Sequence, residues 1–464
     1  MSNYKSTFGV EIHLELNTNT KAFSSSPVST TMEPNTAISP TDLAYPGTKP
    51  RLNKKVVEHA FKLATLLKMD IADVLHFDRK NYIYPDLSKG FQITQFYNPI
   101  GKKGIFTIIN QDGVKKEIQI TEIHIEEDTA KQVKLSGGKI GFDFNRAGVA
   151  LIEIVTGHED FETIEEVTQF VEQFRQLALL LNISNCKFED GSIRTDINVS
   201  VSNTTELGNR VEIKNLNSIS NMRDALKFEI DSQIKTIESG STVEVVTKRF
   251  DEATRQTVFM RNKESITDYN YFPEANILPI NIVSFKEQWS KDILINSISE
   301  RQTLENENVN FEDINILLSN VQLFNLYKEL GISSIAFIKN LLMGTLKDAS
   351  LTLSNLSLKL EDYKNIISLL KDSKMTSTEA KVLIINSAKE SVTDEIAKLS
   401  SREALTIEDL KLLIIEIDNE NPELKDERPV RKLKFVMGQL MKKTKGAINA
   451  KEAMELLKEH YEIT

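Results

Sequence analysis

Acidic and imidazole side chains alternate with apolar ones near the start of the sequence. In residues 9–16, Glu11, His13 and Glu15 occupy every second position between apolar residues. If this segment is a β-strand, the three side chains share one face, because successive side chains of a strand point to opposite faces. A carboxylate and an imidazole placed in this way can bind one cation. The pattern is equally typical of an antiparallel strand whose polar face simply contacts water.

Four later segments carry chemistry of the same kind. Three of them alternate apolar with ionisable or polar residues, and the fourth is an apolar run with one carboxylate in its middle. Their ionisable residues are Glu122, His124, Glu126 and Asp128 in and just after residues 120–126, Glu153 in residues 151–155, Arg194 and Asp196 in residues 193–201, and Glu212 and Lys214 in residues 211–214.

Glu153 is the most informative of these carboxylates, because its neighbours on both sides favour burial. An isolated ionised carboxylate in a buried place costs several kcal/mol. Two carboxylates about 5 Å apart repel by roughly 3 kcal/mol at an effective dielectric constant near 20. If the strands lie side by side, we therefore expect a cation among the acids, and oxygen ligands with one imidazole suit Mg²⁺ or Mn²⁺ better than Zn²⁺. The alternative, which spacing alone does not exclude, is an ordinary ion-pair network with Arg194, Arg210 and Lys214.

The elements that would position these side chains define an α+β protein. Residues 1–285 are rich in predicted strands and turns, with amphipathic helices expected at residues 53–68, 162–181 and 215–238. From about residue 285, Pro and Gly become scarce and apolar residues recur at helical spacing. We predict an N-terminal domain on a mainly antiparallel sheet with flanking helices, followed by all-α domains. Asn53 is expected to cap the first helix, and Thr376 and Thr406 begin capping-box motifs.

Residues 77–95 combine aromatic rings, cations and amides around turns at Pro85 and Gly90. This composition is typical of a binding loop, because cations bind phosphate or carboxylate groups and aromatic faces stack on a base. A polar hairpin with aromatic cross-strand pairs explains the composition equally well. Residues 268–274 form a second dense polar and aromatic segment.

The composition excludes several classes of protein. The chain has 464 residues, a formal net charge of −10 and one cysteine, Cys186, so it forms no internal disulfide and no cysteine-rich zinc site. No apolar run approaches the roughly 18 residues of a membrane span. The first residues enter a predicted strand at once, so we expect no signal peptide and a cytoplasmic protein. Phosphate-loop and dinucleotide-binding motifs are absent from the sequence.

One region is clearly basic, although the protein as a whole is acidic. A local cluster of this kind favours contact with an RNA backbone over simple solvation. It consists of Arg428, Arg431, Lys432, Lys434, Lys442, Lys443 and Lys445.

Taken together and in order, these motifs resemble those of the B subunits of aspartyl/glutamyl-tRNA amidotransferases, and the resemblance spans nearly the whole chain. It is carried by residues 9–13, 44–47, 77–95, 124–128, 145–148, 151–155, 212–218 and 268–274, and more weakly by residues 342–344 and 436–442.

The resemblance implies a domain organisation and an activity. Residues 1–285 would form a cradle domain with an ATP-dependent, kinase-like site, residues 286–345 a helical connector, and residues 346–464 a helical tail that contacts tRNA. With ATP and Mg²⁺, such enzymes phosphorylate the side-chain carboxylate of Glu on tRNA(Gln) or of Asp on tRNA(Asn). Ammonia that the amidase (A) subunit releases from glutamine then displaces the phosphate. A third, small (C) subunit holds the other two together.

The resemblance also implies roles for particular residues. Glu11, His13, Glu126 and Glu153 would form the metal and catalytic set, with Asp196 and Glu212 as further catalytic members. Arg79, Lys80 and Lys89 are candidates to bind the nucleotide phosphates. Arg428, Arg431, Lys432, Lys442, Lys443 and Lys445 would contact the tRNA.

The first loop departs from the pattern of some family members, which bind zinc there through two cysteine pairs. Residues 23–27 and 39–42 of this chain contain no cysteine, so we expect no zinc. A non-catalytic tRNA-binding scaffold, with the acids as structural ion pairs, is the alternative function. A metal-dependent hydrolase unrelated to tRNA is a more distant one.

Overall fold

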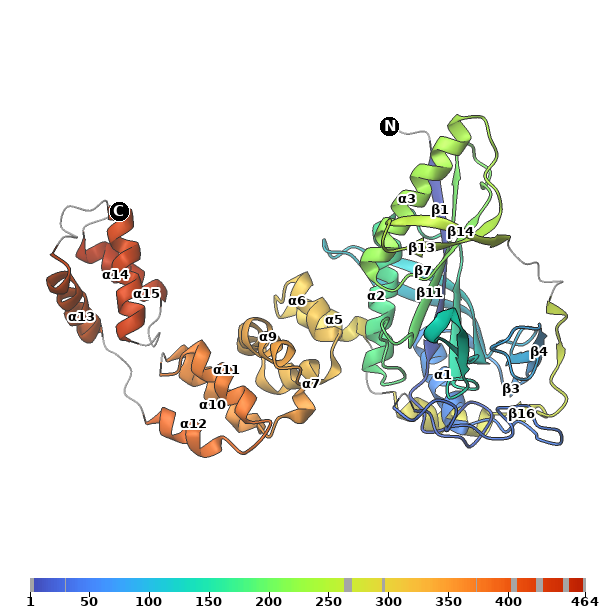
Figure 1. Cartoon of the computed structure of the whole chain (residues 1–464), viewed down its shortest axis with the longest axis horizontal. Helices are drawn as coiled ribbons and strands as arrows, with labels where there is room; N and C mark the ends of the chain where they lie inside the picture. Colours follow the sequence, from blue (N-terminus) through green and yellow to red (C-terminus); the bar gives the residue numbers. More distant parts are fainter. Residues whose placement is uncertain are drawn as a thin grey trace. The chain divides into compact units, whose positions relative to one another are not determined.

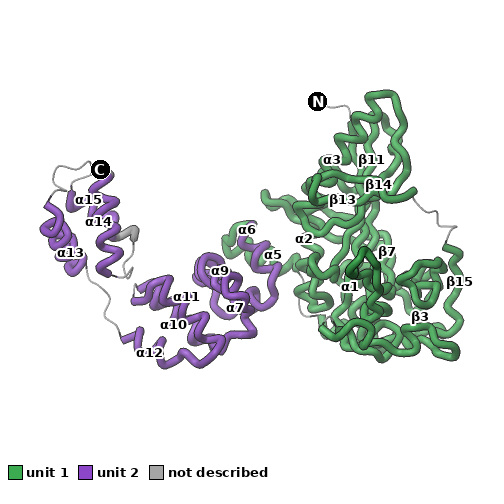
Figure 2. Tube along the Cα trace, in the orientation of Figure 1, with its two compact units in different colours: residues 1–311 green, residues 312–464 purple. Residues whose placement is uncertain are grey.

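The computed structural model describes residues 4–29, 31–262, 269–293, 297–372, 374–401, 407–422, 429–444 and 450–461. The chain divides into two compact units, residues 1–311 and residues 312–464 (Figures 1 and 2). The first unit combines a large sheet with helices, and the described part of the second is helical, so the predicted α+β class is confirmed. The predicted boundaries near residues 285 and 345 stay predictions.

A nine-stranded sheet organises the first unit, with strand β1 (Lys5–Glu15) at its centre. Neighbouring strands are antiparallel throughout, except that β12 and β13 are parallel. The five alternating or apolar segments of the sequence lie in β1, β7, β10, β11 and β12, as predicted. In sheet order the strands are β14 (Gln256–Asn262), β13 (Val246–Asp251), β12 (Val211–Lys214), β11 (Ile193–Ser202), β1, β10 (Ala150–Thr156), β7 (Lys115–Glu127), β6 (Gly101–Ile109) and β2 (Asp70–Ile71).

Helices cover one face of this sheet. The helices α1 (Lys54–Leu66), α2 (Ile164–Leu180) and α3 (Ile219–Glu238) contact the sheet strands, and Figure 1 shows α2 and α3 running beside the long strands. Val10 and Ile12 of β1 are fully buried in the core beneath them. The alternation of β1 therefore places Glu11 and His13 on the opposite face. The three predicted helices are confirmed to within a few residues.

Local capping explains where these helices begin. The Asn53 side chain accepts a hydrogen bond from the Lys55 amide, as the sequence predicted. Thr163 forms a capping box with Glu166 at the start of α2. These side chains satisfy amide groups that have no partner inside the helix, which stabilises each helix start by about 1 kcal/mol.

Three smaller sheets complete the described part of the first unit. Residues 77–95 contain an antiparallel hairpin of β4 and β5, without the expected aromatic cross-strand pairs, and the binding role of this segment stays a prediction. A third strand, β15, pairs with β4 on its other edge. The small strands are β3 (Val74–Leu75), β4 (Asp78–Asn81), β5 (Phe91–Thr94), β8 (Lys131–Lys134), β9 (Ile140–Asp143), β15 (Phe272–Pro273) and β16 (Ile280–Asn281), and helices α4 (Val283–Lys291) and α5 (Ser297–Asn306) end the unit.

The second unit consists of short helices in its described residues. Thr376 caps its helix through the expected capping box with Glu379, whereas Thr406 lies outside the described residues. No described helix has the length and apolarity that a membrane crossing requires. The helices are α6 (Phe311–Leu318), α7 (Val321–Leu330), α8 (Ile335–Phe337), α9 (Met343–Asp348), α10 (Leu360–Lys371), α11 (Ser377–Asn386), α12 (Thr393–Ser400), α13 (Ile407–Glu420), α14 (Pro429–Lys443) and α15 (Ala450–His460).

The first loop is held together by a buried polar network at the two stretches where some members of the resembled family carry zinc-binding cysteines. The carboxylate of Asp42 accepts hydrogen bonds from Ser26 Oγ at 2.6 Å and from the Ser39 amide at 2.8 Å. The ammonium group of Lys21, a fully buried side chain, lies 3.3 Å from the same carboxylate. Burial works to raise the pKa of Asp42, but the serine hydroxyls and Lys21 hold it below its usual range. Serine, aspartate and lysine thus join the stretches in this chain, and the absence of zinc stays a prediction.

We predict that Lys21→Met destabilises the first unit by roughly 3 kcal/mol, because it leaves a buried carboxylate without its cation. Trp289 is the only tryptophan and is buried in this unit, so its fluorescence during urea denaturation of the full chain reports the unfolding. Lys49→Met, which changes an exposed lysine of the same loop, is the matched control and should have little effect. Equal stability of the two variants would show that the network does not hold the loop.

Candidate active site

The register of four neighbouring strands brings the acidic side chains together on the face opposite the helices. On β1, His13 lies opposite Glu153 of β10, and Glu11 lies opposite Asp196 of β11. One strand further, Leu151 of β10 pairs with Glu126 of β7. Directly opposed residues, and those two positions apart on one strand, point to the same face. All five ionisable groups therefore share that face.

The potential ligand atoms of these residues form two overlapping groups. His13, Glu126 and Glu153 make up one group, and Glu11, His13 and Asp196 make up the other. Within each group the ligand atoms lie within 4.8 Å of one another, and Glu11 Oε1 is 3.5 Å from His13 Nε2. We call these five residues the acidic cluster. Their spacing and their mainly oxygen donors fit Mg²⁺ or Mn²⁺, with His13 as the single nitrogen ligand.

Burial and mutual repulsion shift the pKa values of Glu11 and Glu153. Burial, followed by the charges of Glu126 and Glu11, raises the pKa of Glu153 well above its ordinary value. Burial also works to raise the pKa of Glu11, but His13 and a hydrogen bond from Glu153 hold that pKa below its ordinary value. Glu153 therefore holds its proton more tightly than Glu11 does. A divalent cation bound here would relieve the repulsion among these carboxylates.

Neutral donors hold Glu126 in place. Thr94 Oγ1 donates to one carboxylate oxygen at 2.5 Å, and Gln92 Nε2 donates to the other at 3.1 Å. Both residues lie on β5, so the hairpin fixes the orientation of Glu126 without neutralising its charge. These two donors were not among the site residues predicted from the sequence. Their placement two residues apart in a short strand was the available signal, because it puts both side chains on one face.

Cationic side chains neutralise Asp128, Asp196 and Glu212, which we call the outer acids. They do not neutralise Glu11, Glu126 and Glu153, which we call the inner acids. Lys214 forms an ion pair with Asp196 and lies 3.8 Å from Glu212. Arg194 binds Asp128 at 2.8 Å. In the part of the chain that the structure describes, Arg210 forms no ion pair. The ion-pair alternative thus accounts for the outer acids, whereas Glu11, Glu126 and Glu153 have no arginine or lysine within 4 Å among the described residues.

Glu212 lies on β12, two strands from β1, and stands apart from the acidic cluster. Its carboxylate accepts a hydrogen bond from Thr247 Oγ1 at 2.7 Å. Glu212 is in neither group of potential metal ligands. Its position suits the support of Lys214 rather than contact with a cation, and its proposed catalytic role stays a prediction.

Of the three candidate phosphate-binding cations, one faces the acidic cluster. Burial works against the charged form of Lys80, but Glu126 and Glu153 raise its pKa above the ordinary value. Arg79 instead forms two hydrogen bonds with Glu274, at 2.6 and 3.1 Å. Lys89 forms an ion pair with Glu127.

A cleft of about 730 Å³ opens over this face of the sheet. Its volume lies within the range of small-molecule sites. The cleft therefore offers negative and positive groups to one bound molecule. Its charged lining includes His13, Lys80, Glu126, Arg194, Asp196 and Lys214.

The predicted tRNA-binding residues lie in or beside α14. Lys434 and Lys442 are exposed on this helix, and Arg431 is exposed near its start. Lys443 is neutralised by Glu416 and Glu420 of α13, at 2.9 and 2.7 Å. The Lys432 ammonium lies 4.0 Å from the centre of the Tyr461 ring. Arg428 and Lys445 lie outside the described residues.

Two family models match the chain. The one described as the GatB/GatE catalytic domain covers residues 6–288, which include every residue of the acidic cluster. The chain belongs to the GatB family. A second model, described as the GatB domain, matches residues 322–460 and includes α14.

Curated members of the GatB family align with the chain over almost its whole length. A protein of Mycoplasma mycoides subsp. mycoides, named as the B subunit of an aspartyl/glutamyl-tRNA(Asn/Gln) amidotransferase, is 40% identical over 476 residues, covering 98% of each chain. The proteins of the same name from Mycoplasma capricolum subsp. capricolum and Ligilactobacillus salivarius are 39% and 35% identical, again over 98% of each chain. The family resemblance inferred from the motifs is confirmed.

We predict that the acidic cluster binds Mn²⁺ and that His13→Ala or Glu126→Gln weakens this binding by at least about ten-fold, because each variant removes one ligand. Electron paramagnetic resonance of free Mn²⁺ during titration measures the affinity. His76→Ala and Glu117→Gln are the matched controls, since both residues are exposed and Glu117 lies on β7 with Glu126. Equal Mn²⁺ affinity in all four variants would exclude a cation site at the acidic cluster.

Proposed function

We propose that this chain is the B subunit of a glutamine-dependent tRNA amidotransferase. In this proposal it uses ATP and Mg²⁺ to phosphorylate the side-chain carboxylate of Glu on tRNA(Gln) or of Asp on tRNA(Asn). Ammonia released from glutamine by the amidase partner then displaces the phosphate and forms the amide. The names of the relatives support this role and the substrate class. The observation that carries the chemistry is that Glu11, Glu126 and Glu153 have no lysine or arginine within 4 Å among the described residues and lie beside Lys80 in a large polar cleft.

The arrangement suits phosphoryl transfer, in which catalysis is mainly positioning and neutralisation of charge. When bound, Mg²⁺ would supply positive charge that offsets the negative charge of the reacting groups. Glu126 and His13 would hold it, and Gln92 and Thr94 keep Glu126 correctly oriented. Lys80 is placed to neutralise charge on the transferring phosphoryl group.

The acceptor of this reaction is itself a carboxylate, so the site must hold it near other negative charges. Lys214 and Arg194 line the cleft beside the acidic cluster and offset part of this repulsion. Lys214 is already paired with Asp196 and Glu212, and Arg194 with Asp128, which fixes their positions before the substrate arrives. Such preorganised charges stabilise a developing negative charge without a cost for reorganisation. The activated acid must also be shielded from water until ammonia reaches it.

The alternative of a non-catalytic scaffold accounts for less of the site. A scaffold needs its buried acids paired with cations, because an unpaired buried charge is strongly destabilising. Asp196 and Glu212 meet this requirement through Lys214. Glu11, Glu126 and Glu153 instead have no lysine or arginine within 4 Å among the described residues, and the charges of Glu126 and Glu11 add to burial in raising the pKa of Glu153, as expected of acids that bind a cation. We therefore favour the catalytic role.

The proposal includes partners and a location. The chain would assemble with the amidase (A) subunit and the small (C) subunit into a heterotrimer in the cytoplasm. Misacylated tRNA would contact the exposed cations of α14, because its phosphates attract lysine and arginine side chains.

We predict that Glu126→Gln and His13→Ala in the assembled complex lower the ATP hydrolysis that depends on misacylated tRNA by at least about 100-fold, since each disturbs charge stabilisation in the transition state. Glutaminase activity should remain. Phosphate release and glutamate formation measure the two activities separately. Glu117→Gln is the matched control and should retain both. Normal tRNA amidation by the first two variants would refute the catalytic role, and a loss of the fold instead of activity would favour the scaffold.

A second prediction concerns the tail. The double variant Lys434→Glu and Lys442→Glu should weaken tRNA binding by about ten-fold and reduce the dependence of log affinity on log salt, because two phosphate contacts are lost. Filter binding at several salt concentrations measures both effects. Lys371→Glu with Lys389→Glu is the control, since it makes the same charge change at exposed sites on other parts of the helical unit. Equal effects of the two double variants would indicate nonspecific attraction only.

A further inference from the structure

The hairpin of β8 and β9, residues 131–143, carries unneutralised positive charge, and we call it the arm. Residues 131–142 contain three lysines and no acid, although the whole chain has a net charge of −10. Lys131, Lys134 and Lys139 are all exposed, and none of them forms an ion pair within the part of the chain that the structure describes. Concentrated charge of one sign attracts a ligand of the other sign.

Hydrogen bonds fix both ends of the arm to the body of the first unit. The Arg146 side chain donates to the carbonyl groups of residues 129 and 130, each at 2.9 Å, just before β8 begins. The carboxylate of Asp143, where β9 ends, accepts a hydrogen bond from the Asn35 amide at 3.0 Å. The turn at the far end, residues 136–138, is exposed. The base of the arm is therefore held in place, and its tip projects from the surface.

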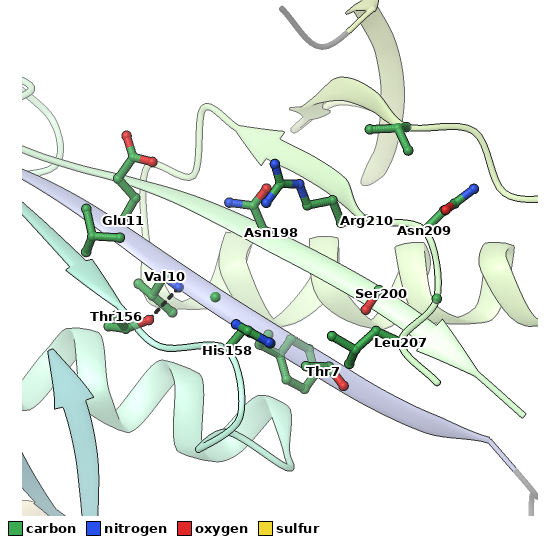
Figure 3. Close-up of a pocket in the computed structure, with 15 residues that line it drawn as sticks. Thr7, Val10, Glu11, Thr156, His158, Asn198, Ser200, Leu207, Asn209 and Arg210 are labelled. Carbon is green, nitrogen blue, oxygen red and sulfur yellow. Dashed lines mark hydrogen bonds between the residues drawn. The ribbon is translucent and has the colours of Figure 1, made fainter. Parts of the chain in front are cut away.

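The base of the arm lies at the cleft that contains the acidic cluster. Lys131 lines this cleft. Lys134 is three residues further along β8, which corresponds to about 10 Å in a strand. Lys134 and Lys139 line neither the cleft nor the cavity of about 400 Å³ beside Gly9 (Figure 3). A ligand that contacts all three lysines therefore extends from the cleft onto the outer surface of the protein.

Apolar side chains accompany these cations. Leu135 and Ile140 are 52% and 62% exposed. A Cβ atom added to Gly141 would lie 3.1 Å from Leu135 Cδ1 and 3.2 Å from Val133 Cγ2, so these two side chains cover one face of the arm. Ile140 lies directly opposite Lys134, and both therefore point to the other face. That face offers a cation beside apolar surface, which matches the alternating phosphates and sugars of an RNA strand.

The charge of the arm favours RNA over a protein as its partner. Lysine is depleted in protein–protein interfaces, and its ammonium group is strongly hydrated. Three unneutralised lysines within residues 131–139 are therefore unfavourable for a protein interface. A nucleic-acid backbone, in contrast, binds exposed lysines and releases its counterions in doing so.

Under the proposed function, an amino acid esterified to the 3′ end of tRNA reaches the acidic cluster, so this end of the RNA enters the cleft. We propose that the arm binds the acceptor end of misacylated tRNA at the rim of the cleft. Lys131, Lys134 and Lys139 contact its phosphates, and Ile140 packs against its sugars. This inference rests on the proposed function and adds an RNA contact to the one proposed for α14.

Lys134→Gln with Lys139→Gln in the assembled complex tests the inference, because both side chains are exposed and their loss leaves the base of the arm intact. We expect the KM for misacylated tRNA in amidation to rise by at least about five-fold, the loss expected for two exposed charged contacts. The kcat should change by less than about two-fold, since these contacts bind the ground state and the transition state equally. The rise in KM should shrink as the salt concentration increases.

The matched control is Lys227→Gln with Lys235→Gln. It makes the same charge change at exposed sites on α3, which covers the other face of the sheet. This control should leave KM unchanged. The unfolding transition of Trp289 fluorescence should be the same in both double variants, which excludes misfolding as the cause of a raised KM.

Photochemical crosslinking locates the partner of the arm. Ser136→benzoylphenylalanine places a photoreactive group at the exposed tip, and we expect it to crosslink to nucleotides of the acceptor arm of the tRNA. A crosslink to another part of the tRNA would overturn the assignment to the acceptor end. A crosslink to the amidase subunit, or loss of assembly in the lysine double variant, would overturn the inference in favour of a protein partner.

The outcomes distinguish this inference from the proposed function. An unchanged KM in the lysine double variant, with normal amidation by the unaltered complex, would overturn the role of the arm alone. A lower kcat with an unchanged KM would also overturn it, because the arm would then affect the chemical step rather than tRNA binding. Failure of the unaltered complex to amidate misacylated tRNA would overturn the proposed function and this inference together.

Discussion

Mutual repulsion of closely spaced carboxylates is the constraint on which this structure depends. Glu11, Glu126 and Glu153 come from three strands and meet without a lysine or arginine within 4 Å among the described residues. Two ionised carboxylates about 5 Å apart repel each other by a few kcal/mol. The fold relieves part of this cost by raising the pKa of Glu153 and by placing Lys80 nearby. A divalent cation bound at this site would relieve the remaining repulsion.

The strand register determines both the hydrophobic core and the geometry of the site. Because side chains alternate, the pairing that buries Val10 and Ile12 under the helices is the same pairing that directs Glu11 and His13 to the polar face. A slip of one residue would exchange the two faces and put charges into the core. The free energy of core packing therefore also maintains the geometry of the acids. Packing against α2 and α3 supports the chemistry even though neither helix touches the acidic cluster.

The polar face of the sheet works as one continuous surface rather than as separate sites. Glu11 joins the cavity beside Gly9 to the acidic cluster, and the hairpin of β4 and β5 brings Lys80 to its other side. Cations that pair with outer acids limit the region where negative charge is left unneutralised.

The local pattern of the sequence determined the five strands of the site, the first three helices, the cap of the first helix and the polar face, because alternation and helical periodicity depend only on near neighbours. It also held enough family motifs to identify the GatB family. The local pattern could not predict the order of the strands in the sheet, because β1 pairs with β10 and β11, which come more than a hundred residues later. Tertiary structure likewise decided that Lys80 faces the acids while its neighbour Arg79 binds Glu274. Such choices depend on contacts between distant segments, and no local pattern encodes which distant charge a side chain will meet.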